Sequence, residues 1–295
     1  MERRTATAEM AEQEQRLRQA LQDKQRIVIK VGSSTITHAE TGDVNLRLVE
    51  QLVRLLADLS GRGKEVILVS SGAIAAGRKV MKQTERPKRT SEKQALAAVG
   101  QAKLMMIYQR LFSEYNQTTA QILLTKDEFL REESFENARN TFAELLRMHV
   151  IPVVNENDTV STSEITFSDN DRLSALVASI TNADLLLLLS DIDGLYTDDP
   201  NKNPEAEFIS FVPQIDEKML AMGKATSSSD FGTGGMRSKV EAARIAADAG
   251  ADMLILHGSD IGSVYDALEG KAVGTLFAAH RNPEFDLISY IRNEY

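Results

Sequence analysis

Short apolar runs alternate along this chain with longer amphipathic stretches, and this alternation constrains the fold more than any other feature. Each run is five to seven residues long and rich in valine, isoleucine or leucine, as expected of strands buried on both faces. The stretches between the runs are long enough for crossover helices, so we predict an α/β fold with a mostly parallel central sheet sandwiched by helices. The predicted strands are Arg26–Val31, Glu65–Ser70, Thr119–Thr125, Val150–Asn155, Asp184–Ser190 and Asp252–Leu256.

Two of the intervening stretches carry apolar side chains every three or four residues, which is the spacing of one buried helix face. Those side chains are Val49, Leu52, Val53, Leu56 and Leu59 in the first helix, and Ala138, Phe142, Leu145 and Leu146 in the later one.

The pattern also predicts the organisation of the chain. The Glu, Gln, Arg and Ala-rich N-terminus is typical of a solvated helix, which Leu17 and Leu21 can dock onto the body. A short apolar run at Phe208–Val212 lies in an otherwise irregular region rich in turn residues. The predicted boundaries are 1–25 for a helical extension, 26–280 for the core domain (a substrate lobe at about 26–183 and a nucleotide lobe at about 184–280), and 281–295 for a short tail.

Composition excludes several classes of protein. With 34 Lys plus Arg against 43 Asp plus Glu, the net charge of −9 argues against nucleic-acid or anionic-membrane partners. No apolar run approaches the roughly 18 residues that span a membrane, and the N-terminus lacks the apolar centre of a signal peptide, so we expect a cytoplasmic protein. The absence of cysteine excludes thiolate and disulfide chemistry, and four scattered histidines argue against a histidine-based metal site or triad.

Polar residues follow the predicted strands at their carboxyl ends, where ligands gather in open α/β sheets. Each cluster alone is explained as well by turns and helix caps, but together they predict a binding edge. The clusters are Lys30–Ser34, Ser70–Ala73, Asn155–Asp158, Ser168–Asp171 and Ser190–Gly194.

A glycine-rich segment, Asp230–Lys239, leads into a predicted helix and is typical of phosphate binding. Glycines let backbone N–H groups approach an anion, a helix N-terminus attracts it, and Lys239 adds a mobile positive charge. The segment matches neither G-x-x-x-x-G-K-[ST] nor G-x-G-x-x-G, because Arg237 stands where the last glycine of the second pattern belongs. A bound nucleotide would therefore be held by another arrangement.

These segments together resemble the amino-acid kinase family, and within it the members that phosphorylate the side-chain carboxylate of L-glutamate with MgATP. The resemblance extends from about Arg26 to Phe277 and implies the amino-acid kinase fold. Its motifs are Val28–Ser34, Ser70–Gly77, Ala97–Gln101, Asn155–Asp158, Asp169–Asp171, Asp191–Thr197 and Gly232–Met236.

The resemblance implies a role for individual residues. Lys30 and Lys239 would neutralise the phosphoryl group in transfer, and Asp171 would hold both lysines in place. Ser71, Asp158 and Asn170 would bind glutamate. The residues implied to bind ATP are Lys30, Ser190, Asp191, Thr233, Gly234, Gly235, Met236, Arg237, Ser238 and Lys239.

The resemblance also implies L-glutamyl 5-phosphate as the product, made in the first step of proline biosynthesis. Magnesium would enter with ATP, held mainly by phosphate oxygens rather than by protein ligands. Implied partners are proline as a feedback inhibitor, further copies of this chain in a dimer or tetramer, and glutamyl-phosphate reductase. Many family members carry a C-terminal PUA-type domain, and we expect this chain to be a form without it.

Elementary chemistry agrees with a carboxylate acceptor. A glutamate side chain with a reference pKa near ~4.3 is already an ionised nucleophile at neutral pH, so the reaction needs no general base and the scarcity of histidine is no obstacle. Two alternatives stay open: a kinase of the same fold for acetylglutamate or aspartate, and a non-catalytic amino-acid sensor. The segments around Ser71 and Asn155–Asp158 decide between the substrates, and loss of a phosphate lysine would mark a sensor.

Overall fold

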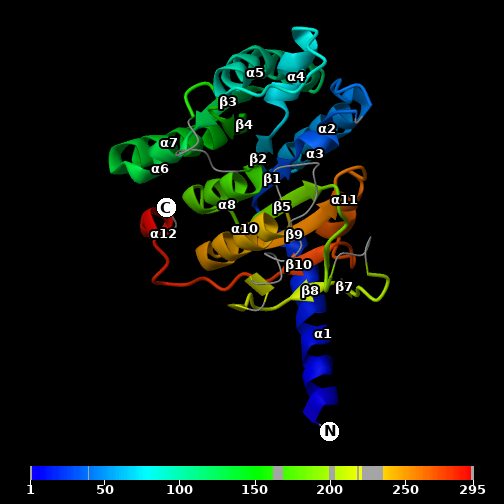
Figure 1. The fold of residues 1–295 in the computed structure, drawn as a ribbon. Coiled ribbons are helices and arrows are strands. Elements are labelled where there is room, and N and C mark those ends of the chain that lie inside the picture. Colours follow the sequence, from blue (N-terminus) through cyan, green and yellow to red (C-terminus); the bar gives the residue numbers. More distant parts are fainter. Residues whose placement is uncertain are drawn as a thin grey trace.

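The computed structural model describes residues 2–38, 40–161, 169–198, 203–217, 219–220 and 235–293, and its centre is an eight-stranded sheet (Figure 1). The strand order is β3-β4-β2-β1-β5-β9-β10-β8, and the neighbours from β3 to β9 are all parallel. Only β10 runs antiparallel to β9, so the predicted mostly parallel sheet is confirmed. The strands of the sheet are β1 (Arg26–Val31), β2 (Glu65–Ser70), β3 (Thr119–Leu124), β4 (Ile151–Glu156), β5 (Leu185–Ser190), β8 (Phe211–Val212), β9 (Asp252–His257) and β10 (Thr275–Phe277).

Every predicted strand is confirmed to within one residue at each end. The run at Phe208–Val212 differs, because it divides into two short strands at Ser210. β7 (Phe208–Ile209) pairs with β6 (Leu195–Tyr196) in a separate hairpin, whereas β8 joins the main sheet beside β10. The Ser210 carbonyl at the break accepts hydrogen bonds from Leu276 N and from the Arg18 guanidinium.

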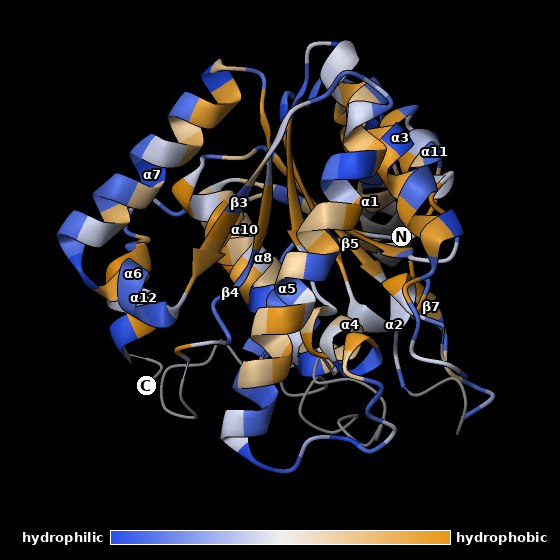
Figure 2. Ribbon diagram, turned by 90° about the horizontal axis from the view of Figure 1, so that it is seen from above, coloured by the Kyte–Doolittle hydropathy of each residue, from blue (hydrophilic) through white to orange (hydrophobic). Residues whose placement is uncertain are grey.

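Helices cover both faces of the sheet, and Figure 2 shows apolar strands between helices whose outward faces are polar. One face packs against η1 (Leu21–Asp23), α2 (Ser33–Ile36), α3 (Leu46–Gly61), α4 (Ala73–Val80), α5 (Thr90–Ser113) and α11 (Ser263–Leu268). The other packs against α6 (Lys126–Leu130), α7 (Glu132–Arg147), α8 (Asn170–Ile180), α10 (Met236–Ala249) and α12 (Leu287–Asn293).

The alternation of side chains along β1 aims its lysine at the second of these faces. Ile27, Ile29 and Val31 belong to the core under α3 and α5, whereas Val28 belongs to the core under α8 and α10. Because side chains two apart in a strand share a face, Lys30 projects on the same side as Val28. The sheet therefore directs Lys30 toward α8 and α10, which pack against each other (Figure 1).

The N-terminal extension is a helix, α1 (Glu2–Ala20), that projects away from the sheet (Figure 1). As predicted, Leu21 is fully buried and Leu17 packs against the same core. Arg18 adds a contact that the sequence did not reveal, since its guanidinium donates to the carbonyl oxygens of Val273 at 2.8 Å and Ser210 at 2.9 Å. Among the described residues, no helix combines the length and the apolar character needed to cross a bilayer.

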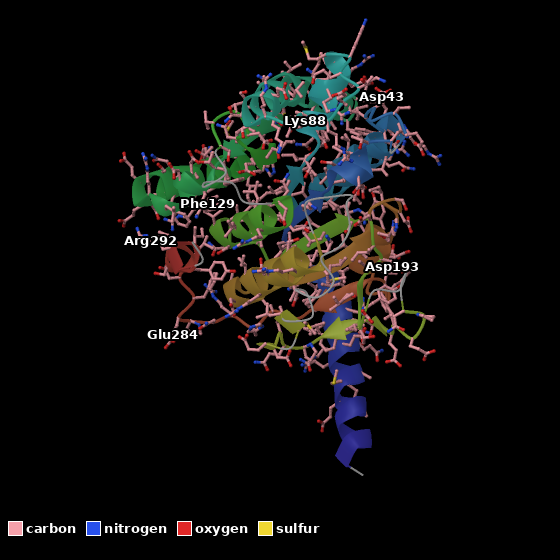
Figure 3. The ribbon with its side chains drawn as sticks, viewed as in Figure 1. Asp43, Lys88, Phe129, Asp193, Glu284 and Arg292 are labelled. Atoms are coloured by element: carbon pink, nitrogen blue, oxygen red, sulfur yellow. The ribbon has the colours of Figure 1, made fainter. Side chains whose placement is uncertain are left out.

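The C-terminal segment, expected to be only a tail, forms α12 and belongs to the core. Leu287 and Ile291, one helical turn apart, are buried in the layer with α6, and the Arg292 guanidinium donates to Leu130 O at 3.4 Å. Figure 3 places Arg292 on the same side of the molecule as Phe129 of α6. A seven-residue helix is too short for its periodicity to stand out in the sequence.

Candidate phosphoryl-transfer site

The carboxyl ends of β1, β2, β4 and β5 meet at one edge of the sheet. In the strand order, β1 lies between β2 and β5, whose following segments begin with Ser71 and Asp191. Such an edge is where parallel α/β sheets bind ligands, because loops and helix N-termini converge there. Several of the residues predicted from the sequence end or follow these strands, or begin α8.

One buried carboxylate joins the two predicted lysines. Lys30 Nζ lies 2.5 Å from Asp171 Oδ1, and Lys239 Nζ lies 3.1 Å from Asp171 Oδ2. Lys30 is 8% exposed, Lys239 3% and Asp171 0%, so all three are removed from solvent. Residues from β1, α8 and α10 thus meet at one point, and two ammonium groups share one counter-ion.

The first turn of α8 places Asp171 between the lysines. Asp169 is the N-cap of this helix, and its Oδ1 accepts hydrogen bonds from Asp171 N at 3.0 Å and Arg172 N at 3.1 Å. Capping by aspartate is favourable here because it satisfies N–H groups that have no partner within the helix. Burial, and then repulsion by the Asp171 carboxylate, raise the pKa of Asp169 to about 6.

Asp171 is an ionised carboxylate between the two lysines. Burial alone would raise the pKa of Asp171, but the ammonium groups of Lys30 and Lys239 outweigh it and hold that pKa well below its ordinary value. The site thus brings two ammonium groups together in a buried position, with Asp171 between them and the carboxylate of Asp169 nearby. Two converging buried ammonium groups favour an anionic ligand beside them.

The start of α10 supplies the second lysine and a hydroxyl. Ser238 Oγ donates to Gly235 O at 2.8 Å and lies 3.3 Å from Asp171 Oδ2. Arg237 points elsewhere, with its Nε 2.7 Å from Glu241 Oε1. Gly235, which precedes Met236, is the N-cap of α10 and has no side chain with which to cap it. Two residues predicted to bind ATP, Thr233 and Gly234, lie outside the described residues.

A chain of hydrogen-bonded amide side chains connects two of the predicted glutamate-binding residues to α5. Asn170 Nδ2 donates to Ser71 Oγ at 2.7 Å and to Asn155 Oδ1 at 2.9 Å. Asn155 Nδ2 in turn donates to Gln101 Oε1 at 3.0 Å. Ser71 and Asn170, from β2–α4 and α8, are thus brought together. Asn155 and Gln101 lay within the sequence motifs but had been assigned no individual role.

Asp158, the third of these residues, lies in the turn after β4 and is partly exposed. Within the described part of the chain, its carboxylate accepts no hydrogen bond and forms no ion pair, so neither kind of interaction joins it to Ser71 or Asn170. Burial, and then the neighbouring Glu156, raise the pKa of Asp158 to about 6. A cationic partner would stabilise the ionised form of this carboxylate, because a positive charge offsets the cost of burial and the repulsion by Glu156.

Ser190 ends β5 at the same edge, and Asp191 follows it. Ser190 Oγ donates to Asp191 Oδ1 at 2.9 Å, and Ser190 O accepts from Gly258 N at 2.6 Å. A Cβ atom at Gly258 would lie 2.5 Å from Thr35 Oγ1, so glycine lets the segment after β9 approach β5 and α2 closely. Among the described residues, no hydrogen bond links Ser190 or Asp191 to the lysine pair.

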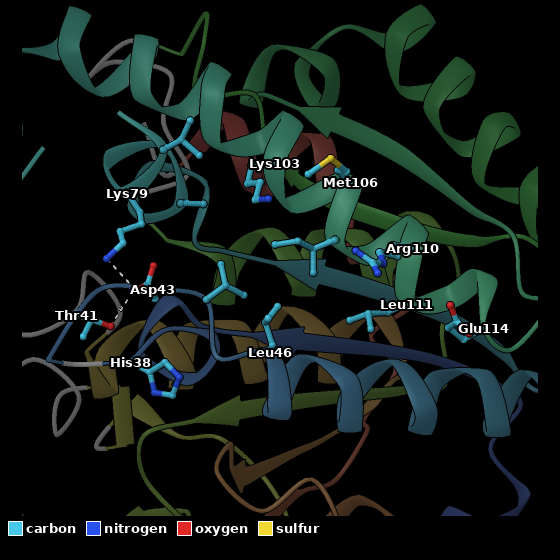
Figure 4. Close-up of a pocket in the computed structure, with 14 residues that line it drawn as sticks. His38, Thr41, Asp43, Leu46, Lys79, Lys103, Met106, Arg110, Leu111 and Glu114 are labelled. Carbon is cyan, nitrogen blue, oxygen red and sulfur yellow. Dashed lines mark hydrogen bonds and ion pairs between the residues drawn. The ribbon is translucent and has the colours of Figure 1, made fainter. Parts of the chain in front are cut away.

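A separate pocket of about 860 Å³ lies between the segment His38–Leu46, α4 and α5 (Figure 4). Lys103, Met106 and Arg110 of α5 line it, and the ion pair between Lys79 and Asp43, 2.8 Å apart, stands at its margin. None of the residues predicted from the sequence lines this pocket, so it is distinct from the lysine cluster.

Comparison with known proteins decides the family. The model of the amino acid kinase family matches residues 25–257. The chain belongs to the amino acid kinase family. Glutamate 5-kinase of Carboxydothermus hydrogenoformans is 52% identical over 263 residues, which cover 88% of this chain and 70% of that protein. Glutamate 5-kinase of Clostridium tetani is 50% identical over 259 residues, covering 88% of this chain and 96% of the relative.

Solved structures agree on the amino acid kinase fold. The UMP kinase of Bacillus anthracis superposes with a TM-score of 0.60 at 15% identity, covering 87% of this chain and 96% of that one. The UMP kinase of Ureaplasma parvum gives a TM-score of 0.58 at 16% identity, covering 86% and 99% of the two chains. At these identities the likeness concerns the fold alone.

Proposed function

We propose that the chain transfers the γ-phosphoryl group of ATP to the side-chain carboxylate of L-glutamate, giving L-glutamyl 5-phosphate in the first step of proline biosynthesis. Relatives named glutamate 5-kinase, about half identical over most of the chain, support the substrate. The observation that carries the chemistry is the pair of buried lysines sharing Asp171.

The reaction brings two anions together, so its main requirement is neutralisation of charge. The glutamate carboxylate is ionised at neutral pH and attacks the γ-phosphorus without a general base. Lys30 and Lys239 stabilise the charge on the phosphoryl oxygens during transfer. Asp171 acts as a positioning residue: its pKa, held low by the lysines, makes it a poor proton acceptor and a permanent counter-ion.

Ser71 and Asn170 bind glutamate in this proposal, and Asp158 binds its ammonium group. The hydrogen bond between Asn170 and Ser71 supports a shared site. The carboxylate of Asp158, which has no ion-pair partner among the described residues, suits a cation. Ser190, Asp191 and the segment 233–239 bind ATP. The proposed substrate lobe comprises about residues 26–183, and the proposed nucleotide lobe about residues 184–280. The two are joined where β1 pairs with β5.

Magnesium enters with ATP and screens its phosphate charges. In this proposal phosphate oxygens supply most of its ligands. We further propose a cytoplasmic homo-oligomer that is inhibited by proline and passes its product to glutamyl-phosphate reductase.

Trapping the acyl phosphate tests the function. With MgATP, glutamate and hydroxylamine, the protein is expected to form glutamyl hydroxamate and to consume ATP in equal amount. Aspartate and acetylglutamate serve as matched acceptors and are expected to give no more than a few per cent of that rate. Faster turnover of either would assign the chain to another acceptor, and no hydroxamate with any of the three would favour the non-catalytic sensor.

Replacing Asp158 by asparagine is expected to raise the KM for glutamate by about 10- to 100-fold, since a charge-assisted hydrogen bond to the ammonium is lost. The KM for ATP should change less than about twofold. In the parent protein, Asp158 takes up a proton as the pH falls through about 6, so the KM for glutamate should rise there. Asp43→Asn, at an exposed ion pair, is the control. Equal effects of Asp158→Asn on both KM values would contradict the assignment.

A further inference from the structure

We infer that Gln101, on α5, is a positioning residue for the amino-acid substrate, because it fixes the direction of the hydrogen-bond chain that ends at Ser71. This inference rests on the proposed function, in which Ser71 and Asn170 bind glutamate. Gln101 itself is 8% exposed and reaches the substrate only through Asn155 and Asn170.

The direction of the chain follows from its donors and acceptors. Gln101 Oε1 accepts from Asn155 Nδ2, so the oxygen of Asn155 faces Asn170. Asn170 Nδ2 then uses one hydrogen for Asn155 Oδ1 and the other for Ser71 Oγ. An amide NH₂ has two hydrogens, so both are committed, and the Asn170 oxygen points away from them.

The order of donors and acceptors determines what Ser71, at the far end of the hydrogen-bond chain, can bind. Because Ser71 Oγ accepts from Asn170, its own hydroxyl hydrogen is left to donate to a further acceptor. A carboxylate oxygen of the substrate is such an acceptor. Reversing the Asn155 amide would turn its NH₂ toward the NH₂ of Asn170 and break this order, and the Gln101 oxygen opposes the reversal.

Two further features of α5 hold Gln101 in place. Gln94 and Tyr108 lie seven residues to either side of it, which is two helical turns, and therefore share its face. Gln94 Nε2 donates to Ser161 O at 3.0 Å, and the Tyr108 hydroxyl lies 2.7 Å from Ser70 Oγ. This face of α5 is thus attached to Ser70, the neighbour of Ser71 at the end of β2, and to Ser161, six residues after Asn155.

The second feature is a backbone contact between α4 and α5. A Cβ atom at Gly100 would lie 1.7 Å from Ala73 O, and one at Gly77 would lie 1.9 Å from Leu96 O. Only glycine permits this approach at either position. Since α4 begins two residues after Ser71, the contact fixes Gln101 relative to the serine whose hydroxyl it orients.

The test compares kinetic constants of Gln101→Met and Gln101→Glu with the parent enzyme. Methionine fills a similar volume without an acceptor and is expected to raise the KM for glutamate about tenfold, with the KM for ATP and kcat within about threefold. Glutamate keeps an acceptor oxygen at the same place, so Gln101→Glu should restore a KM within about threefold of the parent value. Gln109→Met makes the same substitution at an exposed position of α5 and is the control, expected to leave both KM values within twofold.

An unchanged KM for glutamate in Gln101→Met would overturn the inference, and so would a parallel rise in both KM values, which indicates a general structural role. If Gln101→Met does not fold, Gln101→Glu decides alone: a KM near the parent value supports the inference, and a rise above tenfold contradicts it. A parent enzyme that forms no glutamyl hydroxamate would instead refute the proposed function.

Discussion

Replacing Lys239 by alanine is expected to lower kcat by a factor of about 10² to 10³, with the KM for glutamate within about threefold of the parent value. Lys239 lies on α10 at the end of the glycine-rich segment, and its ammonium shares Asp171 with Lys30. Its charge acts on the phosphoryl group during transfer, and a preorganised donor in such a position typically contributes this much to the rate.

Steady-state kinetics with both substrates varied would measure this effect. Lys239→Arg keeps the charge but replaces a compact ammonium group by a larger, planar guanidinium group. It should therefore recover only part of the lost rate. Lys271→Ala, at an exposed lysine paired with Asp266 at 2.6 Å, is the control and should leave kcat unchanged. Turnover of Lys239→Ala at the parent rate would remove this lysine from the reaction.

The second large effect is expected from Asp171→Asn, which should lower kcat at least 100-fold and also destabilise the fold. Asparagine has nearly the same shape but no charge, so the two buried ammonium groups would lose the carboxylate that they share. Removing one partner from a buried ion pair typically costs about 3–5 kcal/mol of unfolding free energy. Urea unfolding of the two proteins at pH 7 would measure the difference.

The difference in unfolding free energy between the parent protein and Asp171→Asn is expected to shrink as the pH falls. The pKa of Asp171 in the folded protein lies below its ordinary value of 3.8, so its stabilisation is complete above pH 3.8 and is lost as the pH falls toward the folded pKa. The free energies of parent and variant should therefore converge in acid. Asp266→Asn at the exposed pair with Lys271 is the matched control, with no change expected. Equal stability of Asp171→Asn and the parent at pH 7 would contradict this account.

Much of the fold could be predicted from the sequence, because buried parallel strands leave a local signal. β1 and β2 match their predicted ranges, since their apolar runs are bounded by polar or turn residues. α12 was missed because a helix of this length takes its stability from packing against α6 rather than from its own periodicity. Ser210 divides β7 from β8 through contacts with residues distant in the sequence, which no local pattern reveals.

The site was predictable in outline for a different reason. The polar clusters after the predicted strands indicated Ser71, Asn155 and Ser190 as candidates. The roles of Lys30, Lys239 and Asp171 came from resemblance to the family. Nothing local shows that one aspartate lies between two lysines about 140 and 70 residues away. Gln101 escaped prediction because its role depends on which amide atom faces which neighbour, a property of tertiary packing alone.

The central claim is that Lys30 and Lys239 act on one phosphoryl group. A crystal structure with magnesium, a non-hydrolysable ATP analogue and glutamate tests this most directly. The account predicts both Nζ atoms at about 3 Å from oxygens around the γ-phosphorus, with the glutamate carboxylate in line on the side opposite the leaving oxygen. A γ-phosphate contacted by only one of these lysines, with the other held apart by Asp171, would contradict it.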